Sequence, residues 1–426
     1  MLEATSPRYY LVAPAGAPNY GDELIVAGWL RRLAETAPEA DVWVDTHTPG
    51  NAAVLLAGLH PRVRFVDTLW QLCAEAPSGS DDPWQVASWV REVINHPGMV
   101  ARLHHGIDAL RRVDVFHVLG GGYVNGIWPR HVGLLGGVVE AARLSGGRAA
   151  MTGQGLLPVG TETTPLLRAL ASHFDVVDVR DAASAELLGM PAAGEHFDDA
   201  FLGLGPASFD DAADAPEVMI CAQADLVSTG TAKLAGMLLG TLRAWEVPPS
   251  KVGVVEGIPR VDRDVFALFE HELPGARFYP FCDVWDRGLP VRPTQTWIST
   301  RFHVHMAAAV AGAGGVAVSV NPDYYTTKHR SLTSLGSGWT MLEDLDTVPE
   351  RPVGGGFDAE LLGRARQAKR ELGRKIYAPV LRRSPEPDAD AGAAAGNGGP
   401  VAPSNADPPA GKSAARPWWR FRRARD

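Results

Sequence analysis

The densest group of side chains that could do chemistry is Ser-Thr-Arg-Phe-His-Val-His at residues 299–305. An apolar strand pattern stops just before it and a helical pattern follows, so Arg301 and His303 are expected at a helix N-terminus, which attracts anions. Arg301 would bind a phosphate or carboxylate there, and His303 would transfer a proton near neutral pH. Ser299 or Thr300 is expected to cap the helix.

His303 and His305 could instead ligate a metal, but side chains two positions apart on a helix point in different directions. We therefore predict no metal site, and a buried, hydrogen-bonded structural role for His305. The three cysteines, Cys73, Cys221 and Cys282, are far apart in the sequence and form neither a CxxC metal motif nor a disulfide framework. This cysteine usage favours a reducing, cytoplasmic location.

Arg180 and Lys328 each follow another predicted strand. A guanidinium binds a carboxylate or phosphate through two parallel hydrogen bonds, and a lysine acts as a mobile positive charge. Two structural alternatives stay open, because Arg180 could pair with Asp178 or Asp181 and Lys328 could be a solvated loop residue. Taken together with Arg301, these residues favour a small substrate with two negative charges.

Turn-forming residues follow the first predicted strand, in the sequence Pro-Asn-Tyr-Gly-Asp-Glu at 18–23. Small residues let the backbone approach a ligand at the start of the next helix. Asn19 and Asp22 could hydrogen-bond a sugar or hold a catalytic loop. Capping of the helix explains Asp22 equally well.

A second loop has three consecutive glycines, in His-Val-Leu-Gly-Gly-Gly-Tyr-Val-Asn-Gly at 117–126. Gly121 and Gly122 would allow a ligand close to the backbone, or would simply form a tight turn. The glycines follow GxGxxxG rather than the dinucleotide fingerprint, which disfavours a nicotinamide cofactor. His131 could face the same ligand or be an ordinary helix residue, and Tyr325 could stack on a sugar.

The composition is that of a globular protein, with 426 residues, 46% hydrophobic and 21% charged, and a net charge of −9 at pH 7. An acidic chain of this kind is not expected to bind nucleic acid. The N-terminus lacks the pattern of an export signal, and no apolar run is long enough to span a membrane.

Strand and helix patterns alternate along both halves of the chain, which predicts parallel βαβ units in two successive Rossmann-like α/β domains. The expected domains are residues 1–205 and 217–382, because a passage rich in Gly, Pro, Ala and Asp separates them. Ligands of such sheets bind at the carboxyl ends of the strands. The expected strands are 9–15, 41–46, 63–67, 113–121, 149–155, 175–181, 218–224, 251–258, 276–281, 296–300 and 315–320. The expected helices include 22–35, 131–144, 231–245, 262–273, 303–312 and 358–381.

The composition changes after the last predicted helix. Residues 383–415 are rich in Pro, Gly, Ala and Asp and predict a disordered linker. Residues 416–426 interleave tryptophan and phenylalanine with arginine. Such a basic and aromatic tail suits an anionic membrane face or an acidic partner, unless it is solvated without a partner.

The segments NYGDE, LGGGYVNG, GQG, DVRDAAS and STRFH, with the later Tyr325 and Lys328, resemble in this order the polysaccharide pyruvyl transferase family over about residues 8–335. The resemblance implies a GT-B-like fold, in which two Rossmann-like domains face a central cleft. It implies transfer of a pyruvyl group from phosphoenolpyruvate to paired hydroxyls of a cell-surface glycan or lipid-linked saccharide, with a ketal formed, phosphate released and no cofactor. It assigns phosphoenolpyruvate to Arg180, Arg301 and Lys328, with His303 as the acid or base, and it places the enzyme in the cytoplasm or at the inner membrane face.

Two other classes stay open at this point. A nucleotide-sugar-dependent glycosyltransferase of GT-B fold would need an acidic or aromatic contact to the nucleotide in the second domain, and Glu256 could supply it. A non-catalytic sugar-binding or scaffold protein would not need the basic cluster.

Overall fold

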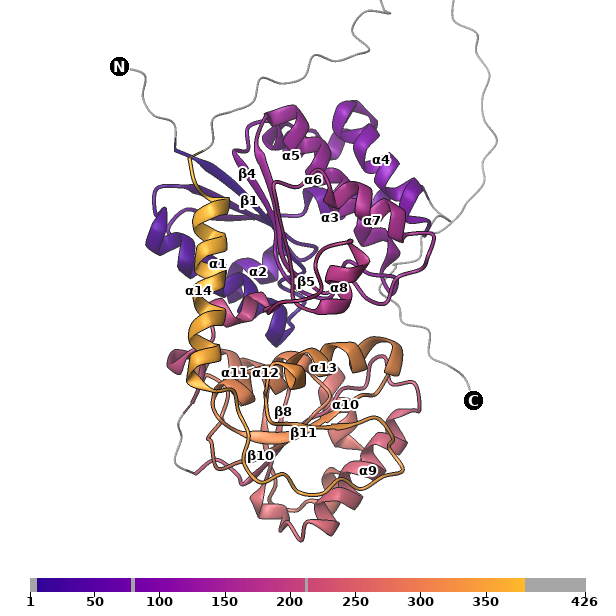
Figure 1. The fold of residues 1–426 in the computed structure, drawn as a ribbon, viewed down its shortest axis with the longest axis vertical. Helices are drawn as coiled ribbons and strands as arrows, with labels where there is room; N and C mark the ends of the chain where they lie inside the picture. The colour runs from indigo at the N-terminus through magenta and orange to yellow at the C-terminus, as the bar shows by residue number, and fades with distance from the viewer. Residues whose placement is uncertain (1–5, 78–80, 211–213, 380–426) are drawn as a thin grey trace, which may run out of the picture. The chain divides into compact units, whose positions relative to one another are not determined.

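Two parallel six-stranded sheets organise the computed structural model, which describes residues 6–77, 81–210 and 214–379 (Figure 1). The first sheet has the order β3-β2-β1-β4-β5-β6, and the second, from its other edge, β9-β8-β7-β10-β11-β12. Both follow the same doubly wound pattern, which confirms the predicted α/β class. Each sheet has one point where the strand order reverses, between β1 and β4 and between β7 and β10, and ligands of such sheets bind at this point.

The first sheet and most of its helices use the N-terminal half of the chain. Its elements are β1 (Arg8–Val12), α1 (Tyr20–Thr36), β2 (Asp41–Asp45), α2 (Pro49–Leu55), β3 (Val63–Val66), α3 (Thr68–Glu75), α4 (Pro83–Asn95), α5 (His104–Leu110), β4 (Val115–Val118), α6 (Val132–Ser145), β5 (Arg148–Gln154), α7 (Thr164–Ala171), β6 (Val176–Val179), α8 (Ala182–Leu187) and the 3-10 helix η3 (Asp199–Leu202).

The second sheet uses the rest of the chain up to residue 342. Its elements are β7 (Val218–Cys221), α9 (Thr231–Ala244), β8 (Val252–Val255), α10 (Val261–Ala267), β9 (Arg277–Tyr279), α11 (Phe281–Arg287), β10 (Thr296–Ser299), α12 (Phe302–Val310), β11 (Gly314–Val318), a π-helical turn (Pro322–Thr326), α13 (Thr327–Ser334) and β12 (Thr340–Leu342). Every predicted strand overlaps an observed one, and β12 is the strand that was not predicted.

The central strands are buried along their whole length because helices cover both faces of each sheet. All four residues of β4 are buried, as are all four of β7 and of β10. Their short length places the loops that follow them directly at the carboxyl edge of each sheet. The residues predicted to do chemistry lie in these loops or at the helix starts just beyond them.

Asn19 caps α1, because its side chain accepts a hydrogen bond from the Gly21 amide at 3.2 Å. The alternative in which Asp22 caps this helix is therefore wrong, and the alternative in which it binds a sugar or holds a loop stays a prediction. Asp22 lies in the first turn, where its carboxylate accepts a hydrogen bond from Asn19 Nδ2 at 2.7 Å. The Asp22 carboxylate therefore bonds to the Asn19 side chain at the carboxyl edge of the first sheet, rather than to the backbone of the helix.

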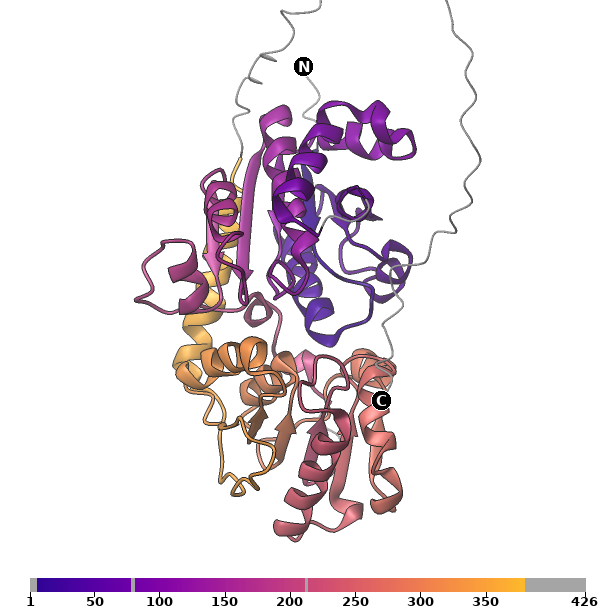
Figure 2. The same cartoon turned by 90° about the vertical axis from the view of Figure 1, so that its right-hand side faces the viewer.

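The last helix, α14 (Ala359–Ile376), follows the second sheet but packs against the first (Figures 1 and 2). Its Lys369 Nζ is 2.5 Å from Asp178 Oδ2 and 2.9 Å from Asp199 Oδ1, and the lysine side chain is 1% exposed. Just beyond the helix, Tyr377 contacts the Tyr9 ring and donates or accepts a 2.8 Å hydrogen bond with His117 Nδ1. The chain thus crosses from the second half back to the first.

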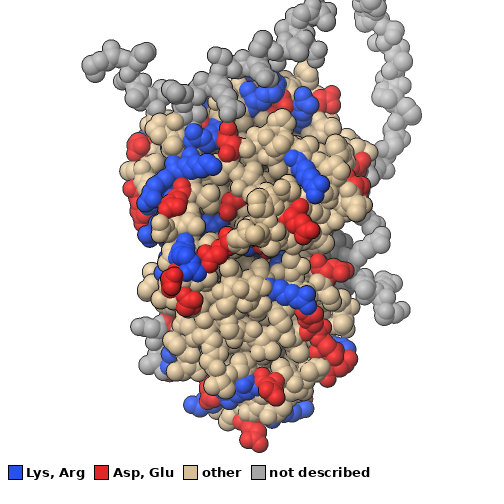
Figure 3. All heavy atoms as spheres, viewed as in Figure 1, with Lys and Arg blue, Asp and Glu red and all other residues tan. Residues whose placement is uncertain are grey.

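Contacts hold the described residues in one compact unit, so the expected division into domains 1–205 and 217–382 remains a prediction. The linker 383–415 and the tail 416–426 lie outside the described residues, and their contact with a membrane also remains a prediction. None of the described helices is both long and apolar enough to cross a membrane. Acidic and basic side chains are interspersed on the face shown in Figure 3.

Candidate active site

One cavity of about 260 Å³ opens where the carboxyl edges of the two sheets face each other. Residues after β1 and β4 line it from one side, and residues after β7 and β10 line it from the other, so both points of strand reversal meet there. It brings together the predicted residues Asn19, Asp22, Gly122, His131, Arg180, Arg301, His303, Tyr325 and Lys328. Gly121 lies just behind the wall, where an added Cβ would be 3.7 Å from Asp22 Oδ1.

Arg180 and Lys328 are buried next to each other on this cavity, with 2% and 8% of their surface exposed. A Cβ added to Gly122 would lie 2.8 Å from both Arg180 Nη2 and Lys328 Nζ. The triple-glycine loop therefore makes room for two cations, and a side chain at its third position would displace the end of Arg180 or of Lys328. Arg180 Nε and Nη2 are buried and donate no hydrogen bond to any of the described residues.

Asp198 is the ion-pair partner of Arg180, with its Oδ2 3.2 Å from Arg180 Nη1. Asp181 Oδ2 is more distant, at 3.8 Å from Arg180 Nε, and Asp178 pairs with Lys369 instead. The predicted alternative of an ion pair with Asp181 is confirmed at this longer distance, the pair with Asp178 is wrong, and the nearer partner Asp198 was not predicted.

Lys328 lies on α13 rather than in a loop, which corrects the prediction for its surroundings. Its Nζ is 3.3 Å from the centre of the Tyr324 ring, and the Tyr324 hydroxyl donates to the Gly122 carbonyl at 2.8 Å. Burial lowers the pKa of Lys328 well below its usual range, and the charge of Arg180 lowers it further. An anion placed between the two side chains would favour the charged lysine.

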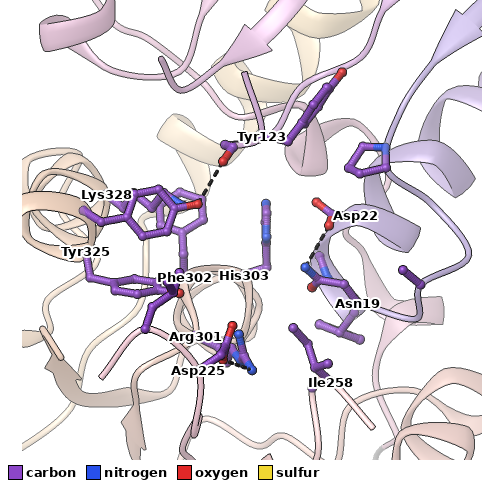
Figure 4. A pocket seen from close by; sticks show the side chains of 18 of the residues that line it. Asn19, Asp22, Tyr123, Asp225, Ile258, Arg301, Phe302, His303, Tyr325 and Lys328 are labelled. Carbon is purple, nitrogen blue, oxygen red and sulfur yellow. Dashed lines mark hydrogen bonds and ion pairs between the residues drawn. The ribbon is translucent and has the colours of Figure 1, made fainter. Parts of the chain in front are cut away.

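His303 projects into the middle of the cavity, between Lys328 on one side and Asp22 on the other (Figure 4). Its side chain is 13% exposed, and its Nε2 lies 3.4 Å from Asp198 Oδ1. Burial raises the pKa of Asp22, although the charges of His303, Lys328 and Arg180 oppose the rise. The cavity therefore holds a titratable imidazole within a mixed set of positive and negative charges.

The guanidinium of Arg301 forms ion pairs with two carboxylates. Its Nε and Nη2 lie 3.1 and 2.5 Å from Asp262 Oδ1, and Nη2 lies 2.9 Å from Asp225 Oδ1. Burial alone would lower the pKa of Arg301, but these two acids outweigh it and raise the pKa. Arg301 lines the cavity as predicted, yet it brings less free positive charge to a substrate than Arg180 and Lys328 do.

Arg301→Ala should lower the free energy of unfolding by about 3–5 kcal/mol, because it leaves the buried Asp262 carboxylate without its cation. Urea unfolding followed by circular dichroism measures this loss. Adding Asp262→Asn to the same chain should recover part of it. Unchanged stability in Arg301→Ala would show that the pair contributes little to the fold.

The start of α12 differs from the prediction. Arg301 occupies the N-cap position, and neither Ser299 nor Thr300 caps the helix with its side chain. Ser299 Oγ instead accepts from the Arg301 amide at 3.1 Å, and Thr300 Oγ1 accepts from the Gln223 amide at 3.0 Å. These bonds fix the strand-to-helix turn that carries Arg301 and His303.

His305 points away from the cavity and is fully buried. Its ring nitrogens are 3.0 Å from His329 Nδ1 and 3.0 Å from Ser337 Oγ. The structural role predicted for His305 is confirmed.

Two further loop glycines, Gly120 and Gly153, pack against the buried side chain of Asp199. Asp199 Oδ2 accepts from the Gly120 amide at 3.0 Å and from Trp29 Nε1 at 2.9 Å. A Cβ at Gly120 or Gly153 would lie 3.0 Å or less from Asp199. In these two positions the sequence motif serves packing around Asp199 rather than a ligand.

A neutral, aromatic wall completes the cavity on the side of the first sheet. Trp128 stacks on His131 at 6.2 Å, and His131 Nδ1 is 2.8 Å from the Tyr123 carbonyl. Burial lowers the pKa values of His47 and His131 to about 4, so both imidazoles are neutral at pH 7. His47, Tyr123 and Trp128 were not predicted as site residues, because single aromatic residues in loops carry no pattern that sequence reasoning could use.

The side chains of Tyr325 and Glu256 both form hydrogen bonds within the protein. The Tyr325 hydroxyl accepts from Gln223 Nε2 at 2.7 Å, while its ring lines the cavity. Glu256 accepts from the amides of Arg260 and Phe281, at 2.8 and 3.0 Å, one with each carboxylate oxygen. Glu256 therefore stabilises two loop ends and is not well placed to bind a nucleotide.

Comparison with protein families adds an independent observation. The family model described as polysaccharide pyruvyl transferase matches residues 19–218. Over these residues the chain is similar to the polysaccharide pyruvyl transferase family. The matched segment contains Asn19, Asp22 and Arg180, while His303 and Lys328 lie beyond its end. A search of curated protein sequences gave no match.

Comparison with solved structures concerns the fold. UDP-GlcNAc 2-epimerase from Methanocaldococcus jannaschii is similar with a TM-score of 0.51 and 10% identity, over 87% of this chain and 99% of that chain. A putative UDP-N-acetylglucosamine 2-epimerase from Listeria monocytogenes gives 0.48 and 12%, over 87% and 89%. The calicheamicin glycosyltransferase CalG4 gives 0.44 and 15%, over 88% and 100%. The fold is GT-B-like, as predicted.

Proposed function

We propose that this protein transfers a pyruvyl group from phosphoenolpyruvate to two hydroxyls of a saccharide, forming a ketal and releasing phosphate. The observation that carries the proposal is the buried pair of cations, Arg180 and Lys328, beside His303 in one cavity. Burying two positive charges together is costly unless anions match them. Asp198 and, at a longer distance, Asp181 pair with Arg180, whereas Lys328 has no ion-pair partner among the described residues, so an anionic group of a substrate would match the charge of Lys328.

Phosphoenolpyruvate has the groups that this site would bind. A carboxylate or phosphate could accept hydrogen bonds from Arg180 Nε and Nη2. These two buried nitrogens make no hydrogen bond to the described residues. Lys328 would contribute a point charge to the second anionic group. Arg301 as a third phosphoenolpyruvate ligand stays a prediction.

The reaction needs one proton delivered and two removed. A proton added to the methylene carbon by His303 leaves positive charge at C2, which one sugar hydroxyl attacks. The C–O bond to phosphate then breaks, and the second hydroxyl closes the ketal. Of the two hydroxyl protons lost, one replaces the proton that His303 gave and the other leaves with phosphate. Arg180 and Lys328 would stabilise the departing phosphate.

The saccharide would bind along the aromatic wall. Tyr123 and Trp128 offer ring faces to the C–H groups of a sugar, and the neutral imidazoles of His47 and His131 can exchange hydrogen bonds with hydroxyls. Asn19 and Asp22 border the same region and could hold the reacting hydroxyl pair. The identity of the saccharide would then depend on the shape of this wall.

Thermal unfolding with candidate donors tests the proposal. Phosphoenolpyruvate at 100 times its dissociation constant should stabilise the protein by about 2.7 kcal/mol, because it binds only the folded state. Pyruvate, inorganic phosphate and a panel of nucleotide sugars serve as comparisons, and Lys328→Met should reduce the effect of phosphoenolpyruvate.

A rise in unfolding temperature with nucleotide sugars alone would favour a glycosyltransferase instead. No response to phosphoenolpyruvate at millimolar concentration would overturn the proposed donor.

A further inference from the structure

We infer that the Tyr325 hydroxyl donates its hydrogen to an anionic oxygen of the substrate, and that Gln223 is the positioning residue that leaves this hydrogen free. The identity of the anionic substrate rests on the proposed function, whereas the direction of the hydrogen bond between the two side chains does not. Tyr325 lies in the π-helical turn after β11, and Gln223 follows β7, so the bond joins two loops at the carboxyl edge of the second sheet.

The orientation of the Gln223 amide is fixed by its neighbour. The Gln223 side chain is buried, and its Nε2 donates to the Asp225 carbonyl at 2.8 Å. A carbonyl oxygen can only accept, so the amide atom next to it must be the nitrogen. The reversed amide would place two oxygens against each other. Gln223 Oε1 makes no hydrogen bond to the described residues, so the Asp225 carbonyl decides the orientation.

The same nitrogen determines the direction of the bond to Tyr325. Gln223 Nε2 lies 2.7 Å from the Tyr325 hydroxyl and has a second hydrogen to donate but cannot accept one. The Tyr325 oxygen is therefore the acceptor, and none of the described residues accepts the hydrogen of the hydroxyl itself. Burial raises the pKa of Tyr325 to about 12, so the hydroxyl keeps this hydrogen at neutral pH.

This unused donor belongs to a residue of the cavity. Tyr325 lines the cavity between Lys328 and Arg301 (Figure 4), and its ring centre is 5.4 Å from Lys328 Nζ. Arg301 is paired with Asp225 and Asp262, so its charge is balanced at this end of the cavity. A neutral hydroxyl can bind an anion there without adding another buried charge, which would be costly.

An anionic substrate with one group on Lys328 extends past the Tyr325 ring, and an oxygen of its second anionic group accepts the hydroxyl hydrogen. Such a bond is roughly twice as strong as one between two neutral groups. Tyr325 then binds the donor substrate through its hydroxyl, and the predicted stacking of its ring on a sugar is not needed.

The affinity for phosphoenolpyruvate, measured by calorimetry in a double-mutant cycle, tests the inference. Tyr325→Phe keeps the ring, removes the hydroxyl and should weaken binding at least about tenfold. Gln223→Glu replaces Nε2 by an oxygen, so the Tyr325 hydroxyl donates to it and is lost to the ligand, and binding should weaken at least as much. In the Gln223→Glu chain, Tyr325→Phe should then change the affinity by less than about threefold.

Gln295→Glu is the matched control. Gln295 is also buried, and its Nε2 also donates to a backbone carbonyl, that of Pro216, at 2.8 Å. Gln295 lies outside the lining of the cavity. The change should lower the unfolding temperature and leave the affinity for phosphoenolpyruvate unchanged.

A second measurement needs neither a ligand nor a variant that must fold like the wild type. Nuclear magnetic resonance of tyrosines labelled with carbon-13 at Cζ reports how fast each hydroxyl hydrogen exchanges with water. The Tyr10 hydroxyl is the internal reference, because it is buried and donates to Asp45 Oδ2 at 2.6 Å. The Tyr325 hydroxyl of the wild type should exchange much faster than that of Tyr10.

Exchange at Tyr325 as slow as at Tyr10 would overturn the inference. Equal affinities of Tyr325→Phe and the wild type, or an equal effect of Tyr325→Phe with and without Gln223→Glu, would also overturn it. Fast exchange at Tyr325 together with no binding of phosphoenolpyruvate to the wild type would support the direction of the hydrogen bond and remove the proposed donor.

Discussion

Arg180→Gln should weaken phosphoenolpyruvate binding at least about 100-fold and abolish the stabilisation that the wild type shows with this ligand. Two buried guanidinium nitrogens of Arg180 make no hydrogen bond to the described residues, and a hydrogen bond to a charged group contributes about 1.5–3 kcal/mol. Isothermal titration calorimetry at constant pH and salt measures the affinity. Arg180→Lys should recover only part of it, because lysine keeps the charge and loses the planar pair of donors.

Arg64→Gln removes an exposed arginine on β3 and provides the matched control, with unchanged affinity expected. Affinity within about threefold of the wild type in Arg180→Gln would show that phosphoenolpyruvate binds elsewhere on the protein.

Lys369→Met should lower the free energy of unfolding by about 3–5 kcal/mol. The lysine is 1% exposed and lies between Asp178 and Asp199, so its removal leaves two carboxylates near each other without a cation. Urea unfolding measures the loss, and adding Asp178→Asn should recover part of it, because one of the two charges is then removed.

Lys375→Met changes an exposed lysine on the same helix and should alter stability by no more than about 0.5 kcal/mol. If Lys369→Met and Lys375→Met have the same free energy of unfolding, the ion pairs of Lys369 with Asp178 and Asp199 do not stabilise the packing of α14 on the first sheet.

Much of the fold could be predicted because parallel strands are marked by short apolar runs. The predicted strand 113–121 extends past β4 only into its glycine loop. Arg180, His303 and Lys328 were predicted together because each follows such a run, and the carboxyl ends of the strands meet at one edge. The sequence alone could not place α14, because an amphipathic pattern shows that a helix covers a core and does not show which one.

The missed residues depend on contacts between distant parts of the chain. Asp198 and Asp199 are adjacent in an irregular segment, where the sequence indicates only a polar turn. Asp198 contacts Arg180 and His303. Asp199 contacts Trp29 and Lys369. The carboxylates around Arg301 come from the loop after β7 and from α10, and no spacing in the sequence relates them to Arg301.

The return of α14 to the first sheet means that the first half does not correspond to one continuous stretch of chain. A fragment that ends before Ala359 would keep all six strands of the first sheet but would bury Asp178 and Asp199 without the amine between them. To separate the halves for study, α14 would have to be fused behind residue 210 through a new loop. A shortened gene that simply stops after the first sheet should give insoluble protein.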